Sequence, residues 1–175
     1  MSSFDILGSS ALFSSTWPIP AGSGKLYASG TTATCNVQGF GAQIHVGTPL
    51  YNCSLSFYYL LVVGFAFSDA QIKRAEVLMH VVPLGCALTT AIVSVALRLY
   101  NDATLWCWIS SLPESCGNDP RGTGDCIRGD HAWIYRWAFY YGPVWFSVIT
   151  VTCNMVAVTY LVWAKEKASK RFHFK

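Results

Sequence analysis

The sequence predicts an all-α protein, a polytopic bundle of transmembrane helices with three full spans and one partial span. The first observation is composition: 53% of the 175 residues are hydrophobic and only 12% are charged. A soluble domain usually carries about twice that charged fraction. The second observation is patterning, because the windows 77–97 and 137–164 contain no formal charge. A membrane-crossing helix needs about 20 mostly apolar residues, so each window is long enough to span.

Three full spans are expected, at about 32–67, 77–99 and 133–164, within a single transmembrane domain that covers residues 1–175. The second and third spans follow from the two charge-free windows. The first is longer, and its N-terminal half is only mildly apolar. We therefore expect that half to face protein or water, as in a long, tilted helix inside a bundle.

The stretch 1–16 is expected to be a partial span. It is apolar but stops at Pro18 and Pro20, which end a helix. About a dozen residues cannot cross a bilayer. Two alternatives remain open, a span shortened in a truncated gene product and a re-entrant segment.

Each full span contains one proline, at Pro49, Pro83 and Pro143. In a helix bundle, neighbouring helices and hydroxyl side chains can satisfy the carbonyls that a proline frees. The prolines therefore predict local kinks, or hinges that allow a change of shape.

The orientation follows from basic residues and cysteines together. Lys73 and Arg74 lie between two spans, and two spans later the tail 165–175 carries five more basic residues, so loop and tail lie on one side. Positive charge near span ends marks the cytoplasm, but the other side carries five basic residues, so this bias is small. Four cysteines on that other side suit an oxidising exterior. We therefore expect the loop 100–132 to lie outside the cell.

The four cysteines on the outer side are Cys35, Cys107, Cys116 and Cys126, whereas the other three lie within spans. Four cysteines allow three pairings. We favour Cys35–Cys107, which ties the long helix to the loop, and Cys116–Cys126, which closes a short turn. A zinc site formed by three of these cysteines with His131 is the alternative, but the cysteines lack the close pairs of structural zinc sites.

The chain contains "TTATCNVQGF", "WCWIS" and "CIRGDHAWIYRWAFYYGPVW", in this order. Together these motifs resemble those of seven-transmembrane G-protein-coupled receptors, in particular the cAMP-receptor-like and secretin-like group of protists and algae. "TTATCNVQGF" followed by "PLYNCSLSFYYLLVV" resembles their third helix, and "CIRGDHAWIYRWAFYYGPVW" the start of their fifth. "WCWIS" resembles the Cys-Trp motif of their outer loop. The Cys35–Cys107 pair corresponds to the disulfide that joins the third helix to that loop in this family.

The resemblance implies a partial seven-helix receptor that transmits an extracellular signal to a heterotrimeric G protein. It covers part of the second helix through the fifth, and the first, sixth and seventh helices have no counterpart. Asp5 becomes an acid within the second helix; such residues are costly in membranes and tend to be functional. One departure is the lack of a basic residue between Gly64 and Lys73, which puts normal G-protein coupling in doubt.

The sequence also suggests individual contact residues. Gln43 lies on the helix face of Cys35, and is expected either to contact a ligand or to make a helix–helix hydrogen bond. Tyr135 and Phe139 are expected to line the outer mouth or to belong to an interfacial aromatic belt. G-protein or anionic-lipid contacts are expected from the basic residues of the inner side, namely Lys73, Arg74, Lys165 and Lys167.

The sequence contains no catalytic, metal-binding or phosphate-binding motif, and no enzyme activity, cofactor or nucleic-acid binding is expected from it. The expected partners are the lipid bilayer, an extracellular ligand and a G protein. The chain is expected to cross a membrane several times, and the expected membrane is the plasma membrane. The alternative function is a small tetraspan-like membrane adaptor or structural protein without signalling activity.

Overall fold

The computed structural model describes residues 2–65, 67–113, 116 and 126–173. Most of this part is helical, which confirms the predicted helical fold class. The main helices and strands are α1 (Ser2–Phe13), α2 (Thr32–Ile44), α3 (Gly47–Tyr59), α4 (Asp69–Ala96), β1 (Tyr100–Asp102), β2 (Cys107–Ile109), α5 (Ala132–Arg136) and α6 (Gly142–His173). Three short segments join them: a 3-10 turn η1 (Ala21–Ser23) and two π-helical turns, η2 (Leu60–Gly64) and η3 (Trp137–Tyr141).

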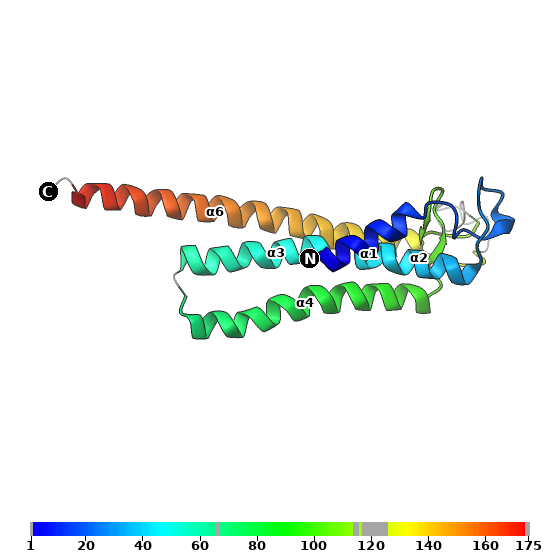
Figure 1. Ribbon diagram of the computed structural model, residues 1–175, viewed down its shortest axis with the longest axis horizontal. Coiled ribbons are helices and arrows are strands. Elements are labelled where there is room, and N and C mark those ends of the chain that lie inside the picture. The colour runs from blue at the N-terminus through cyan, green and yellow to red at the C-terminus, as the bar shows by residue number, and fades with distance from the viewer. Residues whose placement is uncertain (1, 66, 114–115, 117–125, 174–175) are drawn as a thin grey trace.

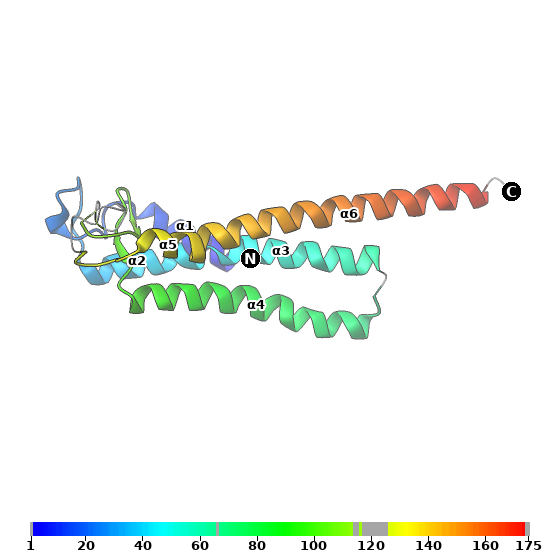
Figure 2. The same cartoon turned by 180° about the vertical axis from the view of Figure 1, so that it is seen from behind.

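The molecule is long and narrow (Figure 1). Helices α2 and α3 follow one another in line, α4 returns beside them, and α6 runs along α3 and beyond it. The view from behind shows the same arrangement (Figure 2). Helix α1 packs along α2, and the hairpin of β1 and β2 closes the end opposite the α3–α4 turn. The two ends of the bundle therefore have different structures.

The helix expected over 32–67 is interrupted between α2 and α3. Pro49 has no N–H to donate to the carbonyl of His45, and the backbone N–H of Thr48 donates to that carbonyl instead, at 3.0 Å. The N–H of Val46 donates to the carbonyl of Gln43 at 3.1 Å. These shorter-range bonds replace the regular helical pattern, so the proline produces a break in hydrogen bonding although both helices keep one direction.

The second long helix begins at Asp69 rather than near residue 77. The backbone N–H of Ser68 donates to Oε1 of Gln71 at 3.1 Å, which satisfies an orphan donor at the helix start. At the other end Arg98 has a left-handed conformation with φ of 55°, which stops the helix. Local capping, which a hydropathy window does not detect, therefore sets both ends.

The last helix also extends beyond its predicted end at 164, and much of the expected tail 165–175 is helical, because α6 continues to His173. The side chains of Lys170 and Glu166 form an ion pair one turn apart, at 2.6 Å. Loss of hydropathy at Lys165 therefore does not mark the end of the helix.

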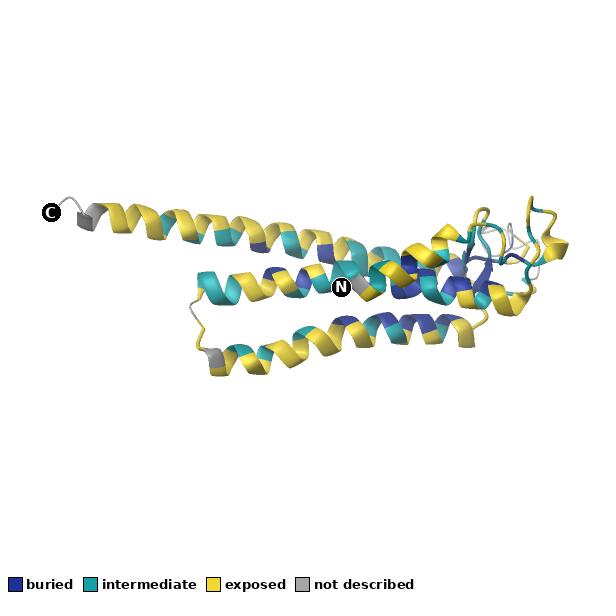
Figure 3. Cartoon of the chain, in the orientation of Figure 1, coloured by how far each residue is buried: buried dark blue, intermediate teal, exposed yellow. Residues whose placement is uncertain are grey.

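The loop 100–132 departs from the all-α prediction, since it contains a two-stranded antiparallel sheet in which Tyr100 pairs with Ile109. A core cluster of Leu99, Tyr100, Ile109 and Ala132 lies beneath it. The Tyr100 side chain is fully buried, burial raises the pKa of its hydroxyl, and the hydroxyl donates to the carbonyl of Ala91 at 3.2 Å. Figure 3 shows that buried residues concentrate at this end of the molecule.

Two helical segments are long and apolar enough to cross a membrane, Ala70–Ala96 and Ala132–Lys170. Only 28% and 11% of their most apolar stretches are buried. Polar contacts join both segments to neighbouring helices; the Asn154 amide on α6, for example, donates to the hydroxyl of Ser56 on α3, at 2.9 Å. Both segments nevertheless have long exposed faces (Figure 3), and these faces carry large apolar side chains.

Candidate functional site

A disulfide anchors the hairpin to the bundle. It joins Cys35, in the first turn of α2, to Cys107, the first residue of β2, with 5.2 Å between their Cα atoms. A second disulfide joins Cys116 to Cys126. These are the two pairs that the sequence analysis favoured, and they occupy all three cysteines that a zinc site with His131 would need.

Hydrogen bonds reinforce this anchor on the α2 side. Oε1 of Gln38 accepts from the backbone N–H of Cys107 at 2.8 Å. The amide nitrogen of the same side chain donates to the carbonyls of Ala11, at 2.9 Å, and Ser15, at 2.8 Å, at the end of α1. One buried glutamine thus fixes α1, α2 and the hairpin relative to one another.

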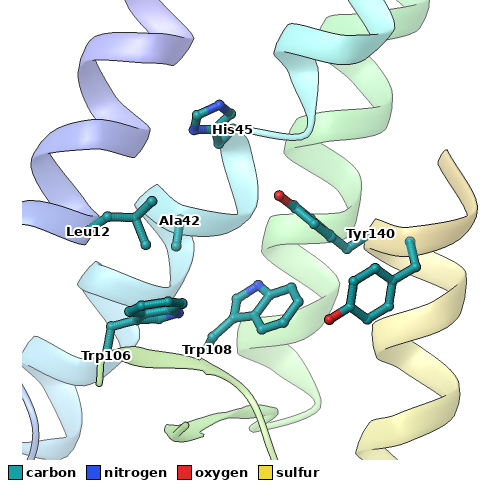
Figure 4. Close-up of a pocket in the computed structure, with 7 residues that line it drawn as sticks. Leu12, Ala42, His45, Trp106, Trp108 and Tyr140 are labelled. Atoms are coloured by element: carbon teal, nitrogen blue, oxygen red, sulfur yellow. The ribbon is translucent and has the colours of Figure 1, made fainter. Parts of the chain in front are cut away.

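Beneath the hairpin lies a cavity of about 230 Å³, which we call the aromatic cavity. Figure 4 shows its side chains converging from four elements: α1, α2 with its C-cap residue His45, the hairpin, and the π-helical turn η3. Its lining residues are Leu12, Ala42, His45, Trp106, Trp108, Tyr140 and Tyr141.

Three aromatic rings make one side of the aromatic cavity. The ring centroid of Trp108 lies 5.0 Å from that of Tyr140 and 6.1 Å from that of Tyr141, with planes at 82° and 89°. Such edge-to-face arrangements are favourable beyond the apolar area that they bury. The aromatic wall is therefore preformed by contacts within the protein.

The π-helical turn η3 has a physical origin in Pro143. The carbonyl of Phe139 would normally accept from the residue four positions on, which is this proline, so the carbonyl is free. The side-chain amide of Gln43 donates to it at 2.9 Å. A π-helical turn of this kind is frequently found at a functional site, and this one carries both tyrosines of the aromatic cavity.

Gln43 is the centre of a buried hydrogen-bond network. Its amide nitrogen also donates to the hydroxyl of Thr90 on α4, at 3.3 Å, and its Oε1 accepts from the indole N–H of Trp108, at 3.1 Å. The residue is 0% exposed. Gln43 therefore does not reach the cavity as a ligand contact; it makes the helix–helix hydrogen bond that the sequence left open as the alternative.

Replacing Gln43 with leucine is expected to lower the free energy of unfolding by about 2 kcal/mol, because the buried indole N–H of Trp108 and the carbonyl of Phe139 lose their partner. Denaturant unfolding in micelles, followed by tryptophan fluorescence, measures the change. Asn52→Leu is the matched control, since this amide on α3 is exposed. A Gln43→Leu protein no less stable than Asn52→Leu contradicts the role of the network.

Tyr135 and Phe139 lie outside the aromatic cavity. Their ring centroids are 5.4 Å apart, and both pack against the core cluster under the hairpin. The residues that sequence reasoning missed are the two tryptophans of "WCWIS", Trp106 and Trp108. The signal was present, because they flank the anchored Cys107 and therefore had to lie close to α2.

Asp5 lies near His45, at the edge of the aromatic cavity. Its Oδ1 accepts from the hydroxyl of Thr48 at 2.7 Å, and Nε2 of His45 lies 4.0 Å from the same oxygen. Asp5, which the resemblance places within the second helix of a receptor, lies on α1 and accepts a hydrogen bond from a hydroxyl of α3, close to the junction between α2 and α3.

The four basic residues predicted as inner contacts lie on α4 and α6 near the α3–α4 turn, which is at the end of the bundle opposite the hairpin (Figures 1 and 2). Lys73 and Arg74 are exposed in the first turns of α4. Nζ of Lys165 donates to the carbonyl of Val63 at 2.7 Å, and Nζ of Lys167 lies 4.8 Å from the centroid of the Trp163 ring. Two of the four predicted contact residues therefore have partners within the protein. Lys165 contacts η2, which follows α3, and Lys167 contacts an aromatic ring of α6.

A comparison with protein families, curated proteins and solved structures finds no match for this chain. Within the described ranges, no three His, Cys, Asp or Glu side chains come together in a way that could hold a metal ion. The lining of the aromatic cavity is apolar and aromatic, with a few polar tips, which is the usual character of a binding pocket.

Proposed function

We propose that the chain is a multi-pass protein of the plasma membrane, a G-protein-coupled receptor or a truncated one, that transmits an extracellular signal to a cytoplasmic G protein. Support for membrane insertion comes from exposure. The core helix of a soluble protein is mostly buried, whereas the two long apolar segments here are not. Large apolar side chains face outward on both of them, among them Val77, Leu78, Val81, Trp145, Phe146 and Ile149.

The observation that supports a receptor best is the disulfide between Cys35 and Cys107 above the aromatic cavity. It fixes the hairpin between α4 and α6 onto the start of α2. A ligand from outside would meet a site whose cover, the hairpin, is held in place by a covalent bond. Preorganisation of this kind lowers the entropic cost of binding.

The proposed mechanism is a shift between two packings of the bundle. A ligand that binds one packing more tightly increases its population. The helix that begins at Ala132 and continues through η3 into α6 connects the aromatic cavity to the basic end. There, Lys165 binds the carbonyl of Val63 just before the α3–α4 turn. Movement of this continuous helix would change the surface around Lys73 and Arg74.

One observation favours the alternative, a tetraspan-like adaptor. The aromatic cavity of about 230 Å³ is smaller than the roughly 300–1,000 Å³ typical of small-molecule sites. An adaptor would use the same disulfides for rigidity and act through its outer loop and helix faces.

Binding of G protein to the chain in lipid nanodiscs tests the receptor proposal. Immobilised protein is expected to retain at least one heterotrimer from a purified panel in the GDP state and to release it on addition of GTPγS. The variant Lys73→Glu/Arg74→Glu is expected to weaken retention at least ~10-fold, because charge reversal at an interface opposes association.

The matched control is Lys25→Glu, a charge reversal at the opposite end that should leave retention unchanged. A membrane-impermeant amine label should reach Lys25 and spare Lys73 in intact cells. Retention of no heterotrimer in a nucleotide-sensitive way would contradict receptor function and favour the adaptor.

A further inference from the structure

A second cavity, of about 350 Å³, lies beside the hairpin, and we call it the arginine cavity. It shares Trp106 and Trp108 with the aromatic cavity, but apart from Ala103 its remaining lining is polar. That part of the lining includes Thr104, Ser110, Ser111 and Arg136. The proposed receptor mechanism involves the aromatic cavity and not this one.

Arg136 is held in place by the hairpin. Its Nε and Nη2 both donate to the carbonyl of Ile109, at 3.2 and 2.8 Å. Its Cζ lies 5.6 Å from the ring centroid of Trp108, within the range of a cation–π contact. These two hydrogen bonds use two of the five N–H donors of a guanidinium. The group is thus oriented before any ligand arrives, with further donors to offer.

Arg136 is the charged residue of the arginine cavity, since every other described residue of its lining is uncharged. No carboxylate in the described part of the chain lies within ion-pair distance of the guanidinium. A fixed guanidinium is well suited to oxyanions, because its planar donors match the geometry of carboxylate and phosphate.

The hydroxyl side chains add to this preference. In an extended chain alternate residues share a face, so Ser110 lies on the same side of the hairpin as Trp108. Ser110 and Ser111 are both 5% exposed, deep in the structure. The cavity therefore combines a cation, hydroxyl groups and two large flat apolar surfaces.

We propose that the arginine cavity binds a small organic anion whose carboxylate or phosphate group meets Arg136 and whose flat apolar body packs against the indoles of Trp106 and Trp108. This site depends on the hairpin and on the helix that carries Arg136. It stands whether the chain is a receptor or an adaptor, and it does not depend on G-protein binding.

Isothermal titration calorimetry of the intact chain in nanodiscs tests the proposal with three probes: benzoate, phenyl phosphate and benzyltrimethylammonium. At least one of the two anions is expected to give a saturable one-to-one isotherm, and the comparison between them identifies the preferred oxyanion. The ammonium probe, of similar size and opposite charge, is expected to give none.

Two substitutions of Arg136 sharpen the test. Arg136→Gln is expected to weaken anion binding at least ~10-fold, and Arg136→Lys is expected to fall between, since lysine keeps the charge but loses the planar donors. Arg98→Gln is the control, because this arginine is exposed and outside the cavity lining; it should bind as the wild type does.

Folding is checked in each variant by the intact Cys35–Cys107 disulfide and by the thermal midpoint. Should Arg136→Gln unfold, Ser111→Ala takes its place, with an expected weakening of about threefold from the loss of one hydrogen bond. The proposal is overturned by three results: neither anion binds, the ammonium probe binds as tightly, or folded variants bind as tightly as the wild type.

Discussion

Removal of the disulfide that anchors the hairpin, in the double variant Cys35→Ser/Cys107→Ser, is expected to lower the free energy of unfolding by about 2–5 kcal/mol, the usual cost of losing a native disulfide. The crosslink joins residues 72 positions apart, so its loss releases a large loop in the unfolded chain. The hairpin then depends on hydrogen bonds such as that from Cys107 to Gln38. Both the aromatic cavity and the arginine cavity are expected to lose their shape.

Thermal unfolding in micelles and limited proteolysis of the hairpin measure this effect. Cys153→Ser is the matched control, because this cysteine on α6 is exposed and not in a disulfide; its midpoint should stay within about 2 °C of the wild type. An equal midpoint for the double variant would mean that the packing beneath the hairpin, and not the crosslink, holds it.

The second large effect is expected from Gly39→Ala, which should lower the free energy of unfolding by about 2–3 kcal/mol, the cost of overpacking a filled core. A Cβ atom at Gly39 would lie 2.5 Å from Cγ of the Tyr100 ring. This ring is fully buried and its hydroxyl is fixed by Ala91, so it has no room to move aside. To relieve this clash, α2 would have to move away from the hairpin.

The same substitution at another helical glycine provides the control. Among the described residues, and apart from the adjoining residues and backbone of α4 itself, no atom lies within 4 Å of the point where a Cβ atom at Gly85 on α4 would stand. Gly85→Ala is therefore expected to be neutral or to stabilise by up to about 1 kcal/mol through helix propensity. Denaturant midpoints of the two variants check the contrast, and similar values for both would show that helix propensity, and not contact with Tyr100, determines the effect.

Much of the architecture could be predicted because a long window without formal charge can be read directly from the sequence. The helices α4 and α6 were found in this way. Their ends were not, because a capping contact such as Ser68–Gln71, or the helical preference of residues after Lys165, depends on local chemistry that hydropathy ignores. The break between α2 and α3 depends on Pro49, whose position was visible but whose effect on hydrogen bonding depends on neighbouring residues.

The site was harder to predict. The sequence shows that Pro143 frees the carbonyl of Phe139, but the side chain that satisfies it, Gln43, lies 96 residues away. The sequence places Gln43 on the same helix face as Cys35. Whether its side chain contacts a ligand or another helix depends on which groups lie near it in three dimensions. Tyr135 was expected at the outer mouth or in an interfacial aromatic belt because it lies at the start of the span 133–164, whereas its helix phase turns it toward the core cluster of the hairpin.

The unbroken course of α6 past the α3–α4 turn gives the molecule a mechanical lever. Its 32 residues span about 48 Å at 1.5 Å per residue. A tilt of roughly 5° about the end near the tryptophans would displace Lys165, about 35 Å along the axis, by about 3 Å. That is enough to detach its ammonium group from the carbonyl of Val63, so a small rotation at the disulfide end would break one contact near the α3–α4 turn.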